Sequence, residues 1–125
     1  MRMALRLTSY GLSLFLGHAA HAQQIEVGTS LVCDTAAQVE RVIAVYDGDI
    51  ESAAEQVDAE EHDPGACVMS AIAYVRGTEL RTARKGNVSF QIVPILILGV
   101  MTPGGMRSVS PARYFSVVEV DERTA

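Results

Sequence analysis

Apolar side chains between positions 35 and 60 recur with the spacing of two consecutive α-helices. In the first segment they stand at i, i+3, i+4 and i+7 and form one face, which consists of Val39, Val42, Ile43 and Tyr46. Thr35 and Gln38 form a capping-box pattern at its start, so a helix is expected from there to about position 46. Asp49 is a suitable N-cap for a second helix that runs to about Glu60, with the buried stripe Ile50, Ala53, Ala54 and Val57.

Beyond the turn signal Pro64-Gly65 the pattern becomes that of β-strands. Residues 66–76 and 88–101 are rich in Val, Ile and aromatic side chains, and residues 114–120 predict a last strand. Residues 23–33 predict a short strand that leads into the first helix. The polar, basic stretch 77–87 is predicted as a long loop, in which positions 78–84 could form a helical turn.

Prolines and glycines set the expected breaks among these strands. Residues 102–105 read Thr-Pro-Gly-Gly and predict a hairpin connection. Pro94 is expected at a bulge, a kink or a sheet edge, because proline cannot donate to the ladder of a central strand. Pro111 is expected to interrupt the chain before the last strand.

These elements predict an α+β domain. We expect an N-terminal helical hairpin packed on a curled antiparallel sheet of three to four strands, for which an SH3-like half-barrel is one form. The length of 125 residues allows one globular domain, placed at residues 23–120, followed by a frayed tail at residues 121–125.

Residues 1–22 have the composition of a secretory signal peptide, with an amphipathic first helix as the alternative. Arg2 and Arg6 give a positive start, and an apolar stretch of about eleven residues follows, which is too short to span a bilayer. Residues 20–22 read Ala-His-Ala and fit a cleavage site, so Gln23 is expected to begin the exported chain. We therefore predict a periplasmic or secreted protein with no membrane span after cleavage.

The two cysteines, Cys33 and Cys67, are predicted to form a disulfide in that oxidising compartment. Free buried thiols and a redox pair are the alternatives, but the spacing is far from the Cys-x-x-Cys of redox dithiols. The bond would join the start of the first helix to the start of the strand that follows the second helix.

Charge is divided between two parts of the chain. Residues 34–63 carry ten acids and one base, whereas residues 76–113 carry six bases and one acid. The basic part predicts contact with an anion or an acidic partner through Arg76, Arg81, Arg84 and Lys85. The alternatives are two solvated faces, or two halves that attract one another. The net charge of −5 and the absence of interleaved aromatics argue against nucleic-acid binding.

The sequence offers little for catalysis or metal binding. After cleavage His62 is the sole histidine, in an acidic turn beside Asp63, and the two cysteines are expected to be oxidised. Neither a metal site nor a cofactor is expected, and the weak metal candidates are Asp58, Glu61, His62 and Asp63.

Several short segments spread over most of the exported chain resemble a group of uncharacterised small exported proteins of rhizobia-like alphaproteobacteria. The segments are Leu31-Val32-Cys33-Asp34-Thr35, Val39-Glu40-Arg41, Ala59-Glu60-Glu61, Ala66-Cys67, Ala73-Tyr74-Val75-Arg76-Gly77 and Tyr114-Phe115-Ser116-Val117. The resemblance implies a bacterial periplasmic or secreted setting, and it carries over no catalytic or binding residue.

The leading prediction is an exported, non-enzymatic binding or interaction module. Its partner would be another envelope protein, for which it could act as an inhibitor, or an anionic envelope component. A small hydrolase or metal-dependent enzyme that uses residues 47–63 is the alternative. A third reading is a structural protein that self-associates as a homo-oligomer through an edge strand near Pro94 or Pro111.

Overall fold

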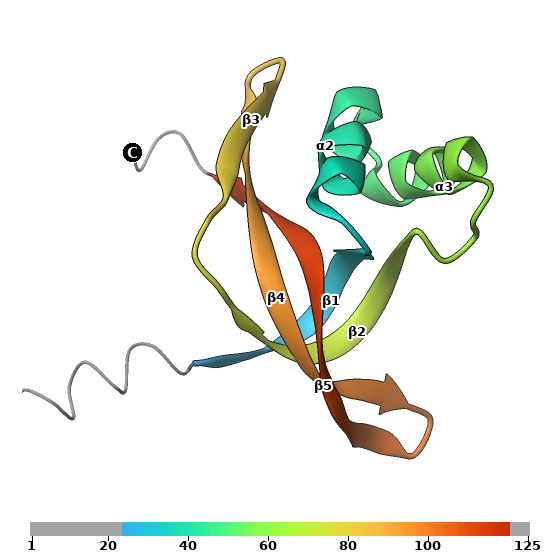
Figure 1. The fold of residues 1–125 in the computed structure, drawn as a ribbon, viewed down its shortest axis with the longest axis vertical. Helices are drawn as coiled ribbons and strands as arrows, with labels where there is room; N and C mark the ends of the chain where they lie inside the picture. Colours follow the sequence, from blue (N-terminus) through green and yellow to red (C-terminus); the bar gives the residue numbers. More distant parts are fainter. Residues whose placement is uncertain (1–23, 121–125) are drawn as a thin grey trace, which may run out of the picture.

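The computed structural model describes residues 24–120, which form two helices and five strands (Figure 1). The signal peptide expected at residues 1–22 and the tail expected at residues 121–125 lie outside the described residues. In chain order the elements are β1 (Ile25–Cys33), α2 (Ala36–Val45), α3 (Ile50–Glu61), β2 (Cys67–Arg76), β3 (Arg81–Lys85), β4 (Val88–Thr102) and β5 (Gly105–Val120). Neither described helix is long and apolar enough to cross a membrane.

All strand pairings in the sheet are antiparallel, which confirms the α+β class. The strand order is β2-β1-β5-β4-β3, and β2 pairs in addition with β4. This second pairing curls the sheet so that β4 contacts three other strands. The expected number of three to four strands is wrong, because the described sheet has five.

The prediction of a loop over residues 77–87 is also wrong, because residues 81–85 form β3. This strand pairs with β4 from Arg81↔Ile92 to Lys85↔Val88. Gly86 and Asn87 make the two-residue turn between the strands, and Gly86 has a φ of 61°. A Gly-Asn pair between two strands is a hairpin signal. The turn therefore folds residues 81–85 back onto β4 as a strand, which their polar composition alone does not indicate.

Pro94 lies within β4 at the point where one side of that strand changes partners. On this side the strand pairs with β3 up to Ile92 and with β2 from Ile95 onward. Residues 77–80 bridge the two partners, and the N–H of Gly77 donates to the carbonyl of Pro94 at 2.8 Å. The proline therefore occupies a gap in the pairing, where its missing N–H costs β4 no ladder hydrogen bond.

Pro111 does not interrupt the chain as expected, because β5 is continuous from Gly105 to Val120. The register shifts around it: Ile97 pairs with Ala112, whereas Gly99 pairs with Ser108. The extra residues of β5 form a bulge that contains Pro111, and a bulge tolerates a residue without an N–H. The hairpin predicted at residues 102–105 is confirmed by the pairing of Thr102 with Gly105.

The two helices begin with the caps that their sequences predict. Thr35 and Gln38 form a complete capping box at the start of α2. The side chain of Asp49 accepts hydrogen bonds from the backbone of Glu51 and Ser52 at the start of α3. The hydroxyl of Ser52 also donates to the Asp49 carboxylate, and these bonds hold the pKa of Asp49 below its usual value.

The two faces of the sheet carry separate hydrophobic clusters. The face on which the helices lie, here called the outer face, joins them in a core of Leu31, Cys33, Val39, Val42, Ile43, Ala53, Ala54, Val57, Cys67, Phe90 and Ile92. The inner face of the curl packs Val32, Ile72, Val93, Ile95 and Ile97. Figure 1 shows both helices beside one end of the sheet, so that the rest of the outer face has no helix over it.

Candidate binding groove on the sheet

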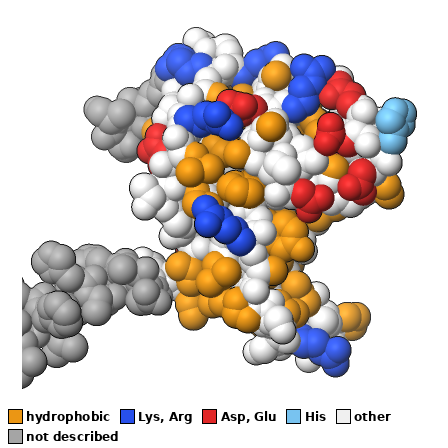
Figure 2. Space-filling model, in the orientation of Figure 1, with side chains coloured by type: hydrophobic (Ala, Val, Ile, Leu, Met, Phe, Trp, Pro, Cys, Tyr) orange, Lys and Arg blue, Asp and Glu red, His pale blue; other side chains and the backbone are white. Residues whose placement is uncertain are grey.

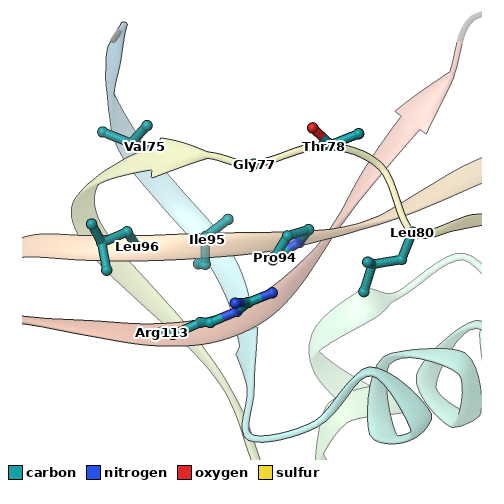
Figure 3. A pocket seen from close by; sticks show the side chains of 8 residues that line it. All are labelled: Val75, Gly77, Thr78, Leu80, Pro94, Ile95, Leu96 and Arg113. Carbon is teal, nitrogen blue, oxygen red and sulfur yellow. The ribbon is translucent and has the colours of Figure 1, made fainter. Parts of the chain in front are cut away.

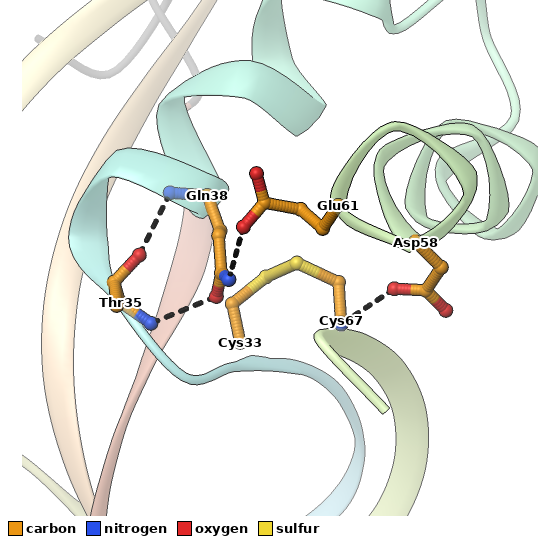
Figure 4. The surroundings of a disulfide bond; sticks show 6 residues. All are labelled: Cys33, Thr35, Gln38, Asp58, Glu61 and Cys67. Atoms are coloured by element: carbon orange, nitrogen blue, oxygen red, sulfur yellow. Dashed lines mark hydrogen bonds between the residues drawn. A yellow bond between two sulfur atoms is a disulfide. The ribbon is translucent and has the colours of Figure 1, made fainter. Parts of the chain in front are cut away.

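The predicted disulfide is present and joins β1 to β2 beneath the helices (Figure 4). Cys33 and Cys67 are register partners with Cα atoms 4.1 Å apart, and both are almost completely buried. Polar contacts surround the bond: the N–H of Cys67 donates to Asp58 at 2.7 Å, and the side-chain amide of Gln38 donates to Glu61 at 2.9 Å. The bond therefore fixes the place where both helices leave and rejoin the sheet.

The four basic residues that the sequence singled out do not gather into one open anion site. Arg76 forms an ion pair with Glu26 of β1, with 2.6 Å between Nη2 and Oε1. Burial lowers the pKa of Arg76, but the hydrogen bonds and charges of Glu26 and Tyr74 together outweigh the burial and raise it overall. The remaining three lie on β3, away from this pair.

The basic residues of β3 face partners of their own. Arg81 forms an ion pair with Glu40 of α2 at 2.9 Å, and the ammonium of Lys85 donates to the carbonyl of Ala44 at 2.6 Å. Arg84 donates to the hydroxyl of Ser89 at 3.0 Å. Two of the four predicted contact residues, Arg81 and Lys85, thus hold β3 against α2.

The acidic candidates for a metal site are taken up by local structure. Asp58 accepts the N–H of Cys67, Glu61 accepts from Gln38, and Asp63 accepts the N–H of Gly65 at 2.9 Å. His62 is the C-cap of α3 in a left-handed conformation, with a φ of 55°. Within residues 24–120 no group of three His, Cys, Asp or Glu side chains is arranged to hold a metal ion.

The uncovered part of the outer face carries a row of side chains that crosses four strands. Ile25 pairs with Val75, Val75 with Leu96, and Leu96 with Arg113. Paired residues of antiparallel strands project on the same side of a sheet, so these four form a continuous row. Ile25 and Leu96 are 57% and 40% exposed, although both are large and apolar.

A groove of about 460 Å³ lies beside this row (Figure 3). Val75, Leu80, Pro94, Ile95 and Leu96 give it apolar walls, Gly77 and Thr78 complete the bridge from β2 to β3, and Arg113 supplies the charged side chain. Figure 3 shows Arg113 on β5 beside Leu96, with Leu80 at the opposite end of the groove from Val75. Figure 2 shows a basic side chain that stands among apolar ones on the surface, apart from the group of acidic side chains.

Arg113 differs from the other arginines of the sheet in its partners. Its guanidinium carbon stands 5.8 Å from the centre of the Phe115 ring, which is a cation–π contact. Within the described part of the chain no carboxylate lies within ion-pair distance of it. An exposed guanidinium with apolar neighbours, and with no carboxylate beside it among residues 24–120, is suited to receive the anionic group of a ligand.

Sequence reasoning did not find this groove, because its members are far apart along the chain. Val75, Leu96 and Arg113 are brought together only by the register of β2, β4 and β5. No spacing rule within one segment links them, and Arg113 counted only toward the general positive charge of residues 76–113.

Another apolar cavity, of about 450 Å³, opens between β2 and the β4–β5 hairpin. Its walls include Val68, Ile72, Val100, Val109 and Tyr114, and the charged side chain among the residues that line it is Asp34. It therefore offers apolar contact without a cation, unlike the groove beside Arg113.

No protein-family model, curated protein or solved structure matches this chain.

Proposed function

We propose that this protein is an exported, non-enzymatic binding module for an anionic envelope component. The groove beside Arg113 would hold an unbranched aliphatic chain that ends in a single anionic group, the chemistry that free fatty acids share with alkyl phosphates. The observation that carries the proposal is the apolar row on the uncovered outer face, which ends at an arginine without a carboxylate partner.

The walls of the groove support an aliphatic ligand. Leu80 and Leu96 are 48% and 40% exposed, and Val75 and Pro94 also line the groove. Each buried methylene of a ligand contributes about 0.8 kcal/mol, so a chain that covers several of these side chains binds without further polar contacts. Pockets of this size with mostly apolar walls and a few polar groups are typical of small-molecule sites.

The charge distribution supports an anionic head group at Arg113. Arg41, Arg76 and Arg81 each have a carboxylate at hydrogen-bonding distance. Their guanidinium groups are therefore already neutralised locally, whereas that of Arg113 is available. The hydrogen bonds of a guanidinium to a carboxylate or phosphate are among the stronger polar contacts in proteins.

A non-enzymatic, exported role fits the chemistry of the described residues. Those acids of residues 47–63 that have partners form a helix cap, a turn, a contact to the β2 backbone and an ion pair. In the ion pair, the hydrogen bond from Arg41 holds the pKa of Glu60 below its usual value. A disulfide of the kind formed by Cys33 and Cys67 persists in oxidising compartments. The resemblance to exported proteins of rhizobia-like alphaproteobacteria points to the same setting.

We propose in addition that α2 and α3 act as a helical hairpin on a curled sheet of the SH3-like half-barrel type. The ion pair between Arg41 and Glu60, with both nitrogen–oxygen distances at 2.9 Å, joins the helices, and the pairing of β2 with β4 supports the curl. In this arrangement the helices occupy one end of the outer face and leave the other end for the ligand.

The test is titration calorimetry of the protein recovered from periplasmic extracts, with three probes below their micelle-forming concentrations. Dodecanoate and dodecyl phosphate are expected to bind one molecule per chain, and neutral dodecanol is expected to bind more weakly. The two anions distinguish a carboxylate source from a phosphate source. The variant Arg113→Gln should weaken binding of the anions by about tenfold to 100-fold, because one charge-assisted contact is lost.

The matched control is Arg107→Gln, an exposed arginine on the same strand that does not line the groove. This variant removes the same charge from the same strand, but outside the groove, so it should leave the affinity unchanged. Leu96→Ser should weaken all three probes together, since it removes apolar wall. Failure of both anions to bind, or equal loss of affinity in the two arginine variants, would overturn the proposal.

A further inference from the structure

The edge of β1 differs from the other free strand edges of the described sheet. β1 pairs with β2 over its whole length, but its register with β5 consists of Cys33↔Phe115. On that side the backbone of Ile25–Thr29 has no ladder partner in the described sheet, and a pocket lies between Thr29 and Glu119 of β5. In Figure 1 β1 runs away from β5 at this end. A strand edge with unpaired backbone groups is a template for another strand.

The other free edges carry features that block the addition of a strand. The outer edge of β3 is five residues long and bears Arg81, Arg84 and Lys85, so two copies of it would repel one another. The free edge of β5 contains Pro111 within a bulge. The first part of β2 has α3 packed beside it, and the N–H of Cys67 is already bound by Asp58. These are the known protections of edge strands.

Residues 25–29 of β1 have none of these protections. The segment reads Ile-Glu-Val-Gly-Thr, without proline, lysine, arginine or a register shift. Its one charge, Glu26, is paired with Arg76. Val27 is 65% exposed and Ile25 57% exposed, so the same segment presents apolar side chains next to its free edge.

The disulfide reveals which backbone groups point outward from this edge. A Cα–Cα distance of 4.1 Å between Cys33 and Cys67 is that of a non-hydrogen-bonded antiparallel pair. Because such pairs alternate, the N–H and C=O groups of Ile25, Val27 and Thr29 face away from β2. Glu26 and Gly28 direct theirs toward β2.

We propose that β1 pairs with β1 of a second copy of this chain, in an antiparallel arrangement centred on Val27. This register places Val27 opposite its copy and Ile25 opposite Thr29 of the other chain, so that all outward-facing backbone groups meet a partner. Glu26 then lies opposite Gly28, and no two like charges are brought together. The contact is two-fold symmetric and self-complementary, as the interface of a homodimer requires.

A second copy suits this edge better than an unrelated strand for two reasons. The pattern of residues 25–29 is complementary to itself in the register centred on Val27, both in its backbone groups and in its charges. The exposed Val27 side chain becomes covered by its own copy, as an apolar cross-strand pair. The acids of residues 34–63 lie on and around the helices and therefore do not oppose this approach.

The first test is the concentration dependence of the mass measured by sedimentation equilibrium, with the protein recovered from periplasmic extracts. We expect a monomer–dimer equilibrium without larger species, because the symmetric contact closes on itself. Val27→Pro removes an outward N–H but no hydrogen bond to β2, and it should abolish the dimer. The control Val27→Thr keeps the N–H and the branched shape, and it should retain the dimer.

A second measurement does not depend on a variant that folds. In hydrogen exchange followed by NMR, the amides of Val27 and Thr29 should become protected as the concentration of the wild-type protein rises. Those of Glu26 and Gly28 should be protected at all concentrations, since they bond to β2. A protein that stays monomeric, a dimer that persists in Val27→Pro, or protection of Val27 that does not change with concentration would each overturn the proposal. The last result would instead indicate another occupant of the edge.

Discussion

Removal of the Cys33–Cys67 bond is expected to lower the free energy of unfolding by about 3–5 kcal/mol. The two cysteines are 34 residues apart, and in the chain-entropy model a loop of this length restricts the unfolded chain by about 3.8 kcal/mol at 25 °C. Both sulfurs are buried, so their replacement by alanine adds a packing loss to this figure. The total is a large share of the roughly 5–15 kcal/mol that stabilises a typical domain.

The assay is urea denaturation of the double variant Cys33→Ala/Cys67→Ala, followed by circular dichroism and compared with the oxidised wild type. The dependence of the unfolding free energy on urea should also steepen, because an unfolded chain without the cross-link exposes more surface. A second pair, Cys33→Val/Cys67→Ala, restores buried volume without the bond. It should recover the packing part of the loss and leave the larger, entropic part.

The reasoning is refuted if the double variant loses less than about 1 kcal/mol, or if the valine pair recovers most of the loss. The first result would mean that the sheet register already restricts the ends of the loop in the unfolded ensemble. The second would mean that the bond acts through packing alone.

Three further perturbations have expected outcomes. Thr35→Ala removes the N-cap of α2 and should lower the free energy of unfolding by about 1 kcal/mol, measured by urea denaturation. Because the hydrogen bonds from Ser52 and the helix backbone lower the pKa of Asp49 in the folded state, its contribution is present above about pH 4 and is lost as the pH falls through that lowered pKa. The stability difference between wild type and Asp49→Asn should therefore shrink as the pH falls through that lowered pKa, and a constant difference would contradict this. Gly77→Ala would bring a Cβ within 2.9 Å of the Pro94 ring and 3.2 Å of its carbonyl oxygen, so the thermal midpoint should fall and ligand affinity should fall with it.

The helices and the disulfide could be predicted from the sequence because their signals are local. The capping box of Thr35 and the N-cap at Asp49 each lie within four residues of the groups that they satisfy. Because residues 1–22 predict export to an oxidising compartment, and the chain has two cysteines, the pairing of Cys33 with Cys67 was the simplest prediction. Local hydrogen bonds and a single covalent pair need no knowledge of the sheet.

The strands were predicted less well, because strand identity depends on partners. Arg81 and Lys85 have no strand pattern of their own, and β3 exists because the Gly86-Asn87 turn folds them back onto β4. Pro111 was read as a break, whereas the bulge in β5 absorbs it. The Gly-Asn turn was a visible signal that the sequence analysis did not use, but the bulge had no sequence signal.

The groove could not be predicted, since it depends on three registers at once. A shift of β4 by one residue relative to β5 would turn Leu96 away from Arg113 and onto the inner face. The basic residues that stand out by their density in the sequence, Arg81, Arg84 and Lys85, prove to have partners within the fold. Arg113, which the sheet brings to the groove, stands apart from that basic cluster in the sequence.

The chain leaves the sheet at Cys33 and returns to it at Cys67, two residues that are neighbours across a ladder. Residues 34–66 are therefore an insert in a long β-hairpin, which the chain enters and leaves at one register pair. Such a segment can be exchanged for another of different length without moving any strand, provided that the replacement brings an apolar face for Leu31, Phe90 and Ile92. The architecture thus offers an exchangeable cap over a constant platform, a position at which evolution or an engineer can graft new sequence while the groove and the β1 edge stay in place.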